Sequence, residues 1–80
     1  MQISLTGPLR SAAGDAASLE IEAKTIRELL KKLVAQYPLM DEYLEQGIAV
    51  SVDGTMYRDD WDVSIPPGVE VVLLPRIQGG

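Results

Sequence analysis

The sequence predicts a single α+β domain in which one main helix lies across a mixed sheet of four to five strands. Three observations carry this prediction: alternating apolar and polar residues near the start, a capped amphipathic segment in the middle, and alternating residues again in the last third. The chain has 80 residues, enough for one small domain and too few for a second. The order strand, strand, helix, strand, short strand, strand favours a helix packed on a sheet.

The first two strands are expected close together at the start of the chain. Residues 1–6 alternate between apolar and polar side chains, which is typical of a half-buried strand. Gly7 and Pro8 break this pattern. Residues 9–18 are small and polar without a period, so we expect a flexible loop there. Residues 19–22 alternate again, and we expect the two strands to pair as a hairpin with a wide loop.

Residues 25–37 give the clearest prediction, an amphipathic helix. Thr25 and Glu28 form a capping-box pattern, in which the hydroxyl and the carboxylate each accept a hydrogen bond from a free backbone N–H. Apolar side chains then recur at helical spacing. Pro38 disfavours helical geometry in the residue before it, so the helix ends there. A short second helix is expected over residues 39–46, followed by a glycine.

The last third of the chain predicts three more strands. Residues 48–52 alternate, residues 53–54 are an Asp-Gly pair typical of a tight turn, and residues 56–57 begin a short return strand. The Pro-Pro-Gly at 66–68 predicts a rigid turn before the last strand, residues 69–74. A right-handed crossover places this last strand beside the first strand and parallel to it.

The last strand is apolar on both faces. Val69, Val71 and Leu73 are expected to face the core, yet Val72 and Leu74 on the other side are apolar too. Such a strand usually lies at the centre of a sheet that is covered on both faces. Because only one good helix is available here, we expect the second face of the sheet to stay open. Two interpretations of this face remain, ordinary apolar exposure or a docking patch for a partner.

The composition excludes several classes of function. The chain has no Cys and no His, which excludes disulfides, cysteine-ligated zinc, iron–sulfur clusters, thiol catalysis and imidazole acid–base chemistry. Twelve acidic and seven basic residues give a net charge of −5, the opposite of a nucleic-acid binder. Neither a membrane span nor a signal peptide is recognisable, so we expect a cytoplasmic protein. No residue set can serve as nucleophile and base, so we expect a protein that is not an enzyme and holds no metal.

The residues after the last strand differ from the rest. Pro75 cannot donate a ladder hydrogen bond, so we expect residues 1–74 to form the domain and residues 75–80 a flexible tail. Six residues reach roughly 20 Å when extended. Because Gly79 and Gly80 carry no side chain, they can pass through a channel that any Cβ would block. This pattern favours a main-chain carboxylate that is delivered into the active site of another protein.

With this element order, the sequence resembles the ubiquitin-like sulfur carriers, which have the β-grasp fold and include the small subunit of molybdopterin synthase and the thiamine-pathway carrier. The resemblance covers the whole chain and is strongest in TIRELLKKLVAQYP, IAVSVDGTMY and PPGVEVVLLPRIQGG. The length and the segment 39–46 are more similar to the molybdopterin subunit. Arg76, Ile77 and Gln78 depart from the prolines and small residues common there. Ubiquitin also has an arginine four positions before its last glycine, where it contacts the activating enzyme.

The resemblance implies a two-step chemistry at the last residue. A partner adenylating enzyme uses ATP to convert the Gly80 carboxylate into an acyl-adenylate, because a carboxylate is a poor acyl donor without a good leaving group. A persulfide donor then displaces AMP and leaves a thiocarboxylate. The sulfur passes to an acceptor, such as the pterin precursor on the large subunit of molybdopterin synthase. The carrier itself binds no cofactor, and ATP belongs to the partner.

Two roles are expected of the residues that precede the acyl site at Gly80. Tail threading is expected of Ile77, Gln78 and Gly79. Partner binding is expected of Val72 and Leu74, because the last strand is apolar on both faces, and of Pro75 and Arg76, which follow them toward the tail. Other acceptors remain open, namely thiamine thiazole, a cysteine precursor and tRNA. Two further alternatives are a ubiquitin-like modifier that links its last glycine to lysines and an interaction module whose glycines are inert.

One further cluster surrounds the sole tryptophan, Trp61. Asp59, Asp60 and Asp62 offer carboxylates to a cation, but their spacing matches no calcium loop, so turn residues are the favoured interpretation. We expect Trp61 to cover the sheet edge rather than to anchor a partner. The lysine pair at 31–32 is expected on the solvated face of the main helix.

Overall fold

A computed structural model describes residues 1–75 of the chain, and within them it has five strands and three helices. The elements follow in the order β1 (Gln2–Leu5), α1 (Pro8–Ala12), β2 (Ser18–Glu20), α2 (Ile26–Gln36), α3 (Met40–Gln46), β3 (Ile48–Val52), β4 (Thr55–Tyr57) and β5 (Val71–Pro75). The α+β prediction and the predicted main helix are confirmed. None of the helices in residues 1–75 combines the length and the hydrophobicity that crossing a membrane requires.

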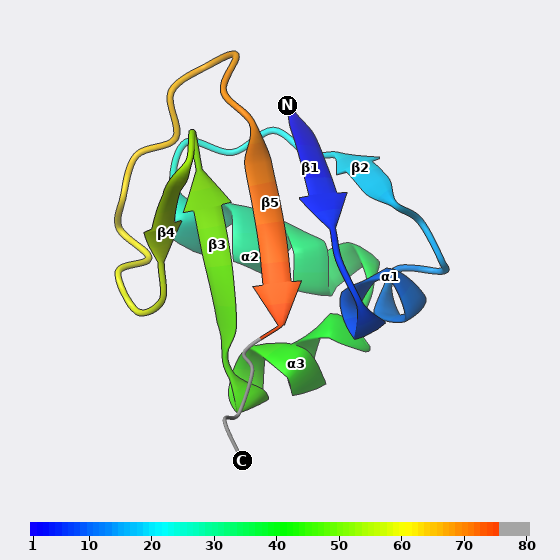
Figure 1. The fold of residues 1–80 in the computed structure, drawn as a ribbon. Coiled ribbons are helices and arrows are strands. Elements are labelled where there is room, and N and C mark those ends of the chain that lie inside the picture. Colours follow the sequence, from blue (N-terminus) through cyan, green and yellow to red (C-terminus); the bar gives the residue numbers. More distant parts are fainter. Residues whose placement is uncertain (76–80) are drawn as a thin grey trace.

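The five strands form one mixed sheet with β5 at its centre. Their order is β2-β1-β5-β3-β4, so the last strand lies between two hairpins that come from distant parts of the chain (Figure 1). β5 runs parallel to β1 and antiparallel to β3. The crossover therefore places the last strand beside the first, as predicted. The Asp53–Gly54 turn between β3 and β4 has positive φ at both residues, as a two-residue hairpin turn of type I′ requires.

The two faces of the sheet have different environments. The face under α2, here called the closed face, holds the core, in which Val50, Val71 and Leu73 pack with Leu29 and Leu33 of the helix. Helices α1 and α3 lie at one end of the sheet, and none of the described helices covers the opposite face (Figure 1). We call this opposite face the open face. The expectation that it stays open is confirmed for the described residues.

Helix α2 begins at a cap that differs slightly from the predicted box. The Thr25 hydroxyl accepts a hydrogen bond from the Glu28 N–H at 3.2 Å, as predicted. The Glu28 carboxylate reaches back to the N–H of Lys24 at 3.2 Å rather than to that of Thr25. The helix ends before Tyr37, whose N–H still bonds to the Leu33 carbonyl. Both ends of α2 are therefore fixed by local sequence.

The expected loop at 9–18 is wrong in its first part, because Pro8–Ala12 form the helix α1. Pro8 occupies the first turn, where its missing N–H removes no helical bond. Leu9, Ala12 and Ala13 lie at helical spacing and are buried. A single turn shows too few apolar residues to establish a period, so alternation alone could not reveal it.

The limits of β5 also differ from the prediction. The strand covers Val71–Pro75 rather than residues 69–74. Val69 lies before the strand and is only partly buried against the core. At the other end, Pro75 pairs with Ile48 as the last residue of the ladder. A proline fits the end of a strand because no further N–H is needed there.

Candidate docking surface

The side chains of β5 divide into two sets of similar chemistry. Val71 and Leu73 face α2 and are 0% exposed. Val72 and Leu74 alternate with them and are half-buried on the open face. The two residues that the sequence predicts as a docking patch therefore lie on one uncovered surface at the centre of the sheet.

The neighbours of these two side chains are small. The sheet register places Val72 between Ser4 of β1 and Ser51 of β3, and it places Leu74 opposite Ala49. Directly opposite side chains on one face are close enough to shield each other when both are large. Because the neighbours are serine and alanine, Val72 and Leu74 protrude from the sheet and remain accessible.

The register extends this surface to residues that sequence reasoning missed. Met56 of β4 lies opposite Ser51 on the open face and is 50% exposed. The apolar members of the surface form a group that we call the sheet-face patch: Ala49, Met56, Val72 and Leu74. The Asp53–Gly54 turn was the signal that could have revealed Met56, because a two-residue turn fixes the register of the hairpin.

A hollow of about 700 Å³ lies beside the end of β5. Ala49, Met56 and Leu74 of the sheet-face patch line one part of it, and Pro75 lines it as well. Arg58 supplies a cation to the same hollow. The patch thus continues into a concave region at the point where the described chain ends.

The end of β5 is held on both sides. The Thr6 hydroxyl donates a hydrogen bond to the Leu73 carbonyl at 3.1 Å. The backbone at Gly7 passes close to the Pro75 ring, since a Cβ added at Gly7 would lie 3.5 Å from it, an ordinary van der Waals distance. On the other side, Ile48 pairs with Pro75. Pro75, one of the predicted partner-binding residues, is therefore fixed within the sheet.

The remaining predicted site residues lie outside the described part of the chain. These are the partner-binding Arg76, the threading residues Ile77, Gln78 and Gly79, and the acyl site Gly80. The structure thus brings together Val72, Leu74 and Pro75 and gives no geometry for the other five.

The described groups with shifted pKa values lie away from the sheet-face patch. The carboxylates of Glu22 and Glu20 raise the pKa of the Met1 amino group, and the same contact lowers the pKa of Glu22. On α2, the carboxylate of Asp62 raises the pKa of Arg27. Within residues 1–75 the patch itself offers apolar contact rather than ionised groups, which suits docking.

The acidic cluster around Trp61 is arranged as turn residues. The Asp62 carboxylate accepts a hydrogen bond from Arg27 Nε at 2.9 Å. Among the described residues no three potential metal ligands converge. The Trp61 carbonyl accepts the Arg27 N–H at 2.7 Å, and its ring is partly buried against the core near α2.

Known structures share this fold at low sequence identity. A chain in the crystal structure of the Amycolatopsis orientalis BexX/CysO complex has a TM-score of 0.78 and 21% identity, and the match covers 99% of this chain and 98% of that one. Mycobacterium tuberculosis CysO, described as an antigen, has a TM-score of 0.78 and 17% identity, and the match covers 95% of this chain and 98% of CysO. The small archaeal modifier protein 1 from Methanosarcina acetivorans has a TM-score of 0.78 and 20% identity, and the match covers 99% of this chain and 94% of the modifier protein. These likenesses confirm the β-grasp fold.

Sequence comparison gives the family. No curated protein matches the chain. The model of the ThiS family matches residues 3–80, which is nearly the whole sequence and includes the last two glycines. The chain therefore belongs to the ThiS family of ubiquitin-like sulfur carriers.

Proposed function

We propose that this chain carries sulfur as a thiocarboxylate on Gly80. One observation supports the proposal above others: the ThiS family match extends through residue 80, and the residues 76–80 follow directly on a strand end that the sheet holds in place. A carrier of this kind contributes a carboxylate and a docking surface, while its partners supply the catalytic groups. The chain is thus a substrate of enzymes rather than an enzyme.

The proposed chemistry has two steps. A Gly80 carboxylate oxygen attacks the α-phosphate of ATP on an adenylating enzyme, which releases pyrophosphate and forms an acyl-adenylate. The terminal sulfur of a protein persulfide then attacks the acyl carbon and expels AMP, giving an acyl disulfide. A thiol on the donor or the enzyme reduces that disulfide, and the thiocarboxylate remains on Gly80. Because the first step consumes ATP, we propose that the carrier works in the cytoplasm.

The sheet-face patch is the proposed contact with the adenylating enzyme. Val72 and Leu74 protrude above small neighbours, and Pro75 continues the apolar surface toward the tail. The buried core of an interface is more apolar than the rest of a protein surface, and removing apolar side chains such as these from water favours association. Arg76 is proposed to select the enzyme through a carboxylate on its surface, because a guanidinium binds carboxylates in a bidentate manner.

The test of the acyl site is an intact mass after reaction with the adenylating enzyme of the same organism, ATP, a persulfide donor and a thiol. We expect a gain equal to sulfur minus oxygen, located on the C-terminal peptide. A chain that ends after Gln78 is the matched control and should gain nothing. The proposal is contradicted if the mass of the full chain stays unchanged although the adenylating enzyme is active, as its exchange of pyrophosphate with ATP shows.

We further propose that the sulfur acceptor is the pterin precursor of molybdopterin, held by the large subunit of the synthase. The support is α3 (Met40–Gln46), which occupies the segment where the sequence is more similar to the molybdopterin subunit than to the thiamine carrier. The thiocarboxylated chain should transfer its sulfur to that precursor in the presence of the large subunit. Transfer to a thiamine thiazole, a cysteine precursor or tRNA instead would identify a different pathway.

A second candidate function is protein modification. The observation in its favour is the likeness to a structure described as a small archaeal modifier protein, at 20% identity. A modifier forms amide bonds between its last glycine and lysines, so slowly migrating conjugates would resist thiol reagents. A carrier leaves no such conjugates. An inert interaction module would keep its function after Gly79 and Gly80 are removed.

A further inference from the structure

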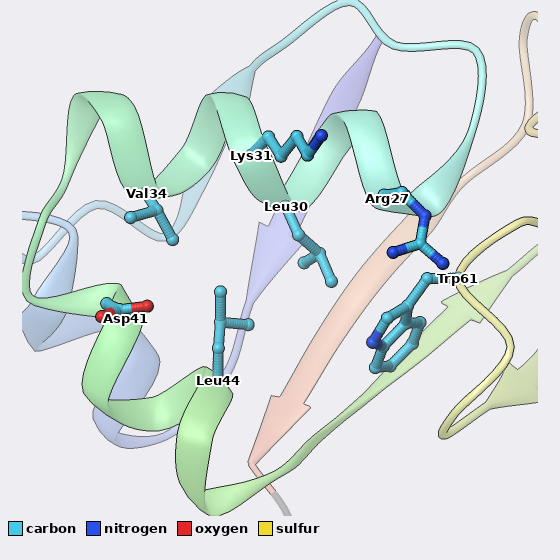
Figure 2. A pocket seen from close by; sticks show the side chains of 7 residues that line it. All are labelled: Arg27, Leu30, Lys31, Val34, Asp41, Leu44 and Trp61. Carbon is cyan, nitrogen blue, oxygen red and sulfur yellow. The ribbon is translucent and has the colours of Figure 1, made fainter.

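A second hollow, of about 390 Å³, lies on the helix side of the molecule between α2, α3 and Trp61. Figure 2 shows Leu30 and Val34 of α2 and Leu44 of α3 pointing into it, with the Trp61 ring at one end. Its volume is at the lower end of the range of about 300–1,000 Å³ for ligand sites. The hollow therefore has room for one large apolar group.

The rim of this hollow carries two cations one helical turn apart. Arg27 and Lys31 are neighbours on α2, and Figure 2 shows the Lys31 side chain extending along the helix toward Arg27. Asp62 holds Arg27 only through Nε, at 2.9 Å, so the terminal amino groups of the guanidinium have no acceptor among residues 1–75. Lys31 forms no ion pair with the described residues either.

The charges of the rim differ from one end to the other. The cations lie at the end near Trp61, whereas Asp41 lies near Val34 (Figure 2). The whole chain has a net charge of −5. Although Asp62 pairs with Arg27, the two cations of the rim still leave one net positive charge at this end. An anion is attracted to the end with Arg27 and Lys31 and repelled from the end with Asp41.

We propose that this hollow docks a segment of a partner protein that presents a bulky apolar side chain beside a carboxylate. The apolar side chain occupies the space over Leu30, Val34 and Leu44, where it also contacts the Trp61 ring. The carboxylate binds Arg27 and Lys31 through charge-assisted hydrogen bonds. Leu44 and Trp61 line both this hollow and the hollow at the end of β5. The proposal does not depend on sulfur transfer.

The sole tryptophan gives a direct measurement, because Trp61 lines the hollow. The probe is a blocked hexapeptide that contains Phe-Glu-Glu, titrated against the full chain while tryptophan emission is recorded. We expect a saturable change in emission, and a weaker one for matched peptides with Phe-Gln-Gln or Ala-Glu-Glu. No saturable change up to about 1 mM peptide, or an equal response to Phe-Gln-Gln, overturns the proposal.

Two adjacent lysines provide matched variants. Lys31→Gln removes a cation from the rim and should weaken peptide binding about twofold to fivefold. Lys32→Gln removes the same charge from a residue that pairs with Glu28 at 3.5 Å, outside the hollow, and should leave binding unchanged. Equal effects of both variants overturn the proposal. It is also overturned if sedimentation shows a dimer of the chain that Lys31→Gln dissociates, because a second copy then fills the hollow.

Discussion

The two faces of β5 have nearly the same chemistry and very different environments. Val71 and Leu73 on the closed face are fully buried, whereas Val72 and Leu74 on the open face are only half-buried. A valine and a leucine occur on each side, so the difference comes from α2 above one face and small neighbours on the other. The closed face accounts for the stability of the fold, and the open face is the one we propose for partners.

The largest effect is expected from truncation on the closed face. Leu73→Ala removes a fully buried side chain and leaves a cavity under α2, so it should lower the free energy of unfolding by about 2–5 kcal/mol. Leu74→Ala is the matched variant on the open face and should cost about 1 kcal/mol. Denaturant unfolding measures both. Equal decreases in the free energy of unfolding for the two variants would contradict the difference between the two faces.

A charge on the open face should act on binding rather than on folding. Leu74→Glu places a carboxylate in the sheet-face patch and should weaken binding to the adenylating enzyme by more than about tenfold. Thr55→Glu adds the same charge at an exposed position of β4 whose side chain points away from the open face, since its partner Val52 is buried. The Thr55→Glu variant should bind the adenylating enzyme with unchanged affinity. Calorimetric titration measures both affinities, and unchanged binding of a folded Leu74→Glu variant would exclude the patch.

The sequence predicted what depends on local pattern. The alternation in β1 and β3, the Thr25 cap and the Asp53–Gly54 turn all act within a few residues, and the structure confirms them. Helix α1 escaped prediction because one turn is too short to show a period. Val69 and Glu70 continue the alternation of the last strand but lie outside β5, because alternation alone does not mark where pairing begins.

The candidate surface was predictable only in part, because its other members meet through long-range pairing. Val72 and Leu74 follow from the double apolar pattern of one strand. Ala49 joins them only through the pairing of β3 with β5, which no local signal specifies. The contact between Arg27 and Trp61 likewise joins residues far apart in the sequence, so the helix-side hollow could not be predicted.

A smaller effect is expected at the start of α2, the helix that makes one face closed. Thr25→Ala leaves the Glu28 N–H without its side-chain acceptor and should cost about 1 kcal/mol in the free energy of unfolding. Thr25→Ser keeps the hydroxyl and should remain within a few tenths of a kcal/mol of the original chain. Thermal unfolding distinguishes the two. Equal stabilities of both variants would show that the cap contributes nothing to the cover of the closed face.

The smallest effect belongs to an exposed contact at the edge of the sheet. The Met1 amino group lies 2.7 Å from a Glu22 carboxylate oxygen. The pKa of Glu22 is lowered from 4.5, so its contribution to stability is present above that value and is lost as the pH falls through the folded pKa. The pKa of the amino group is raised from 8.0, so its contribution is present below 8.0 and is lost as the pH rises through the folded pKa.

The pair should therefore stabilise the fold only between these two transitions, and only weakly because both groups face solvent. N-terminal acetylation removes the ammonium without touching either face of β5. Carbon-detected NMR titration of the Glu22 carboxyl should then show its pKa return to the usual range, while the chemical shifts of Val72 and Leu73 stay unchanged. If Glu22 titrates identically in the acetylated chain, the ion pair does not form in solution, and the edge of the sheet is held by the β1–β2 ladder alone.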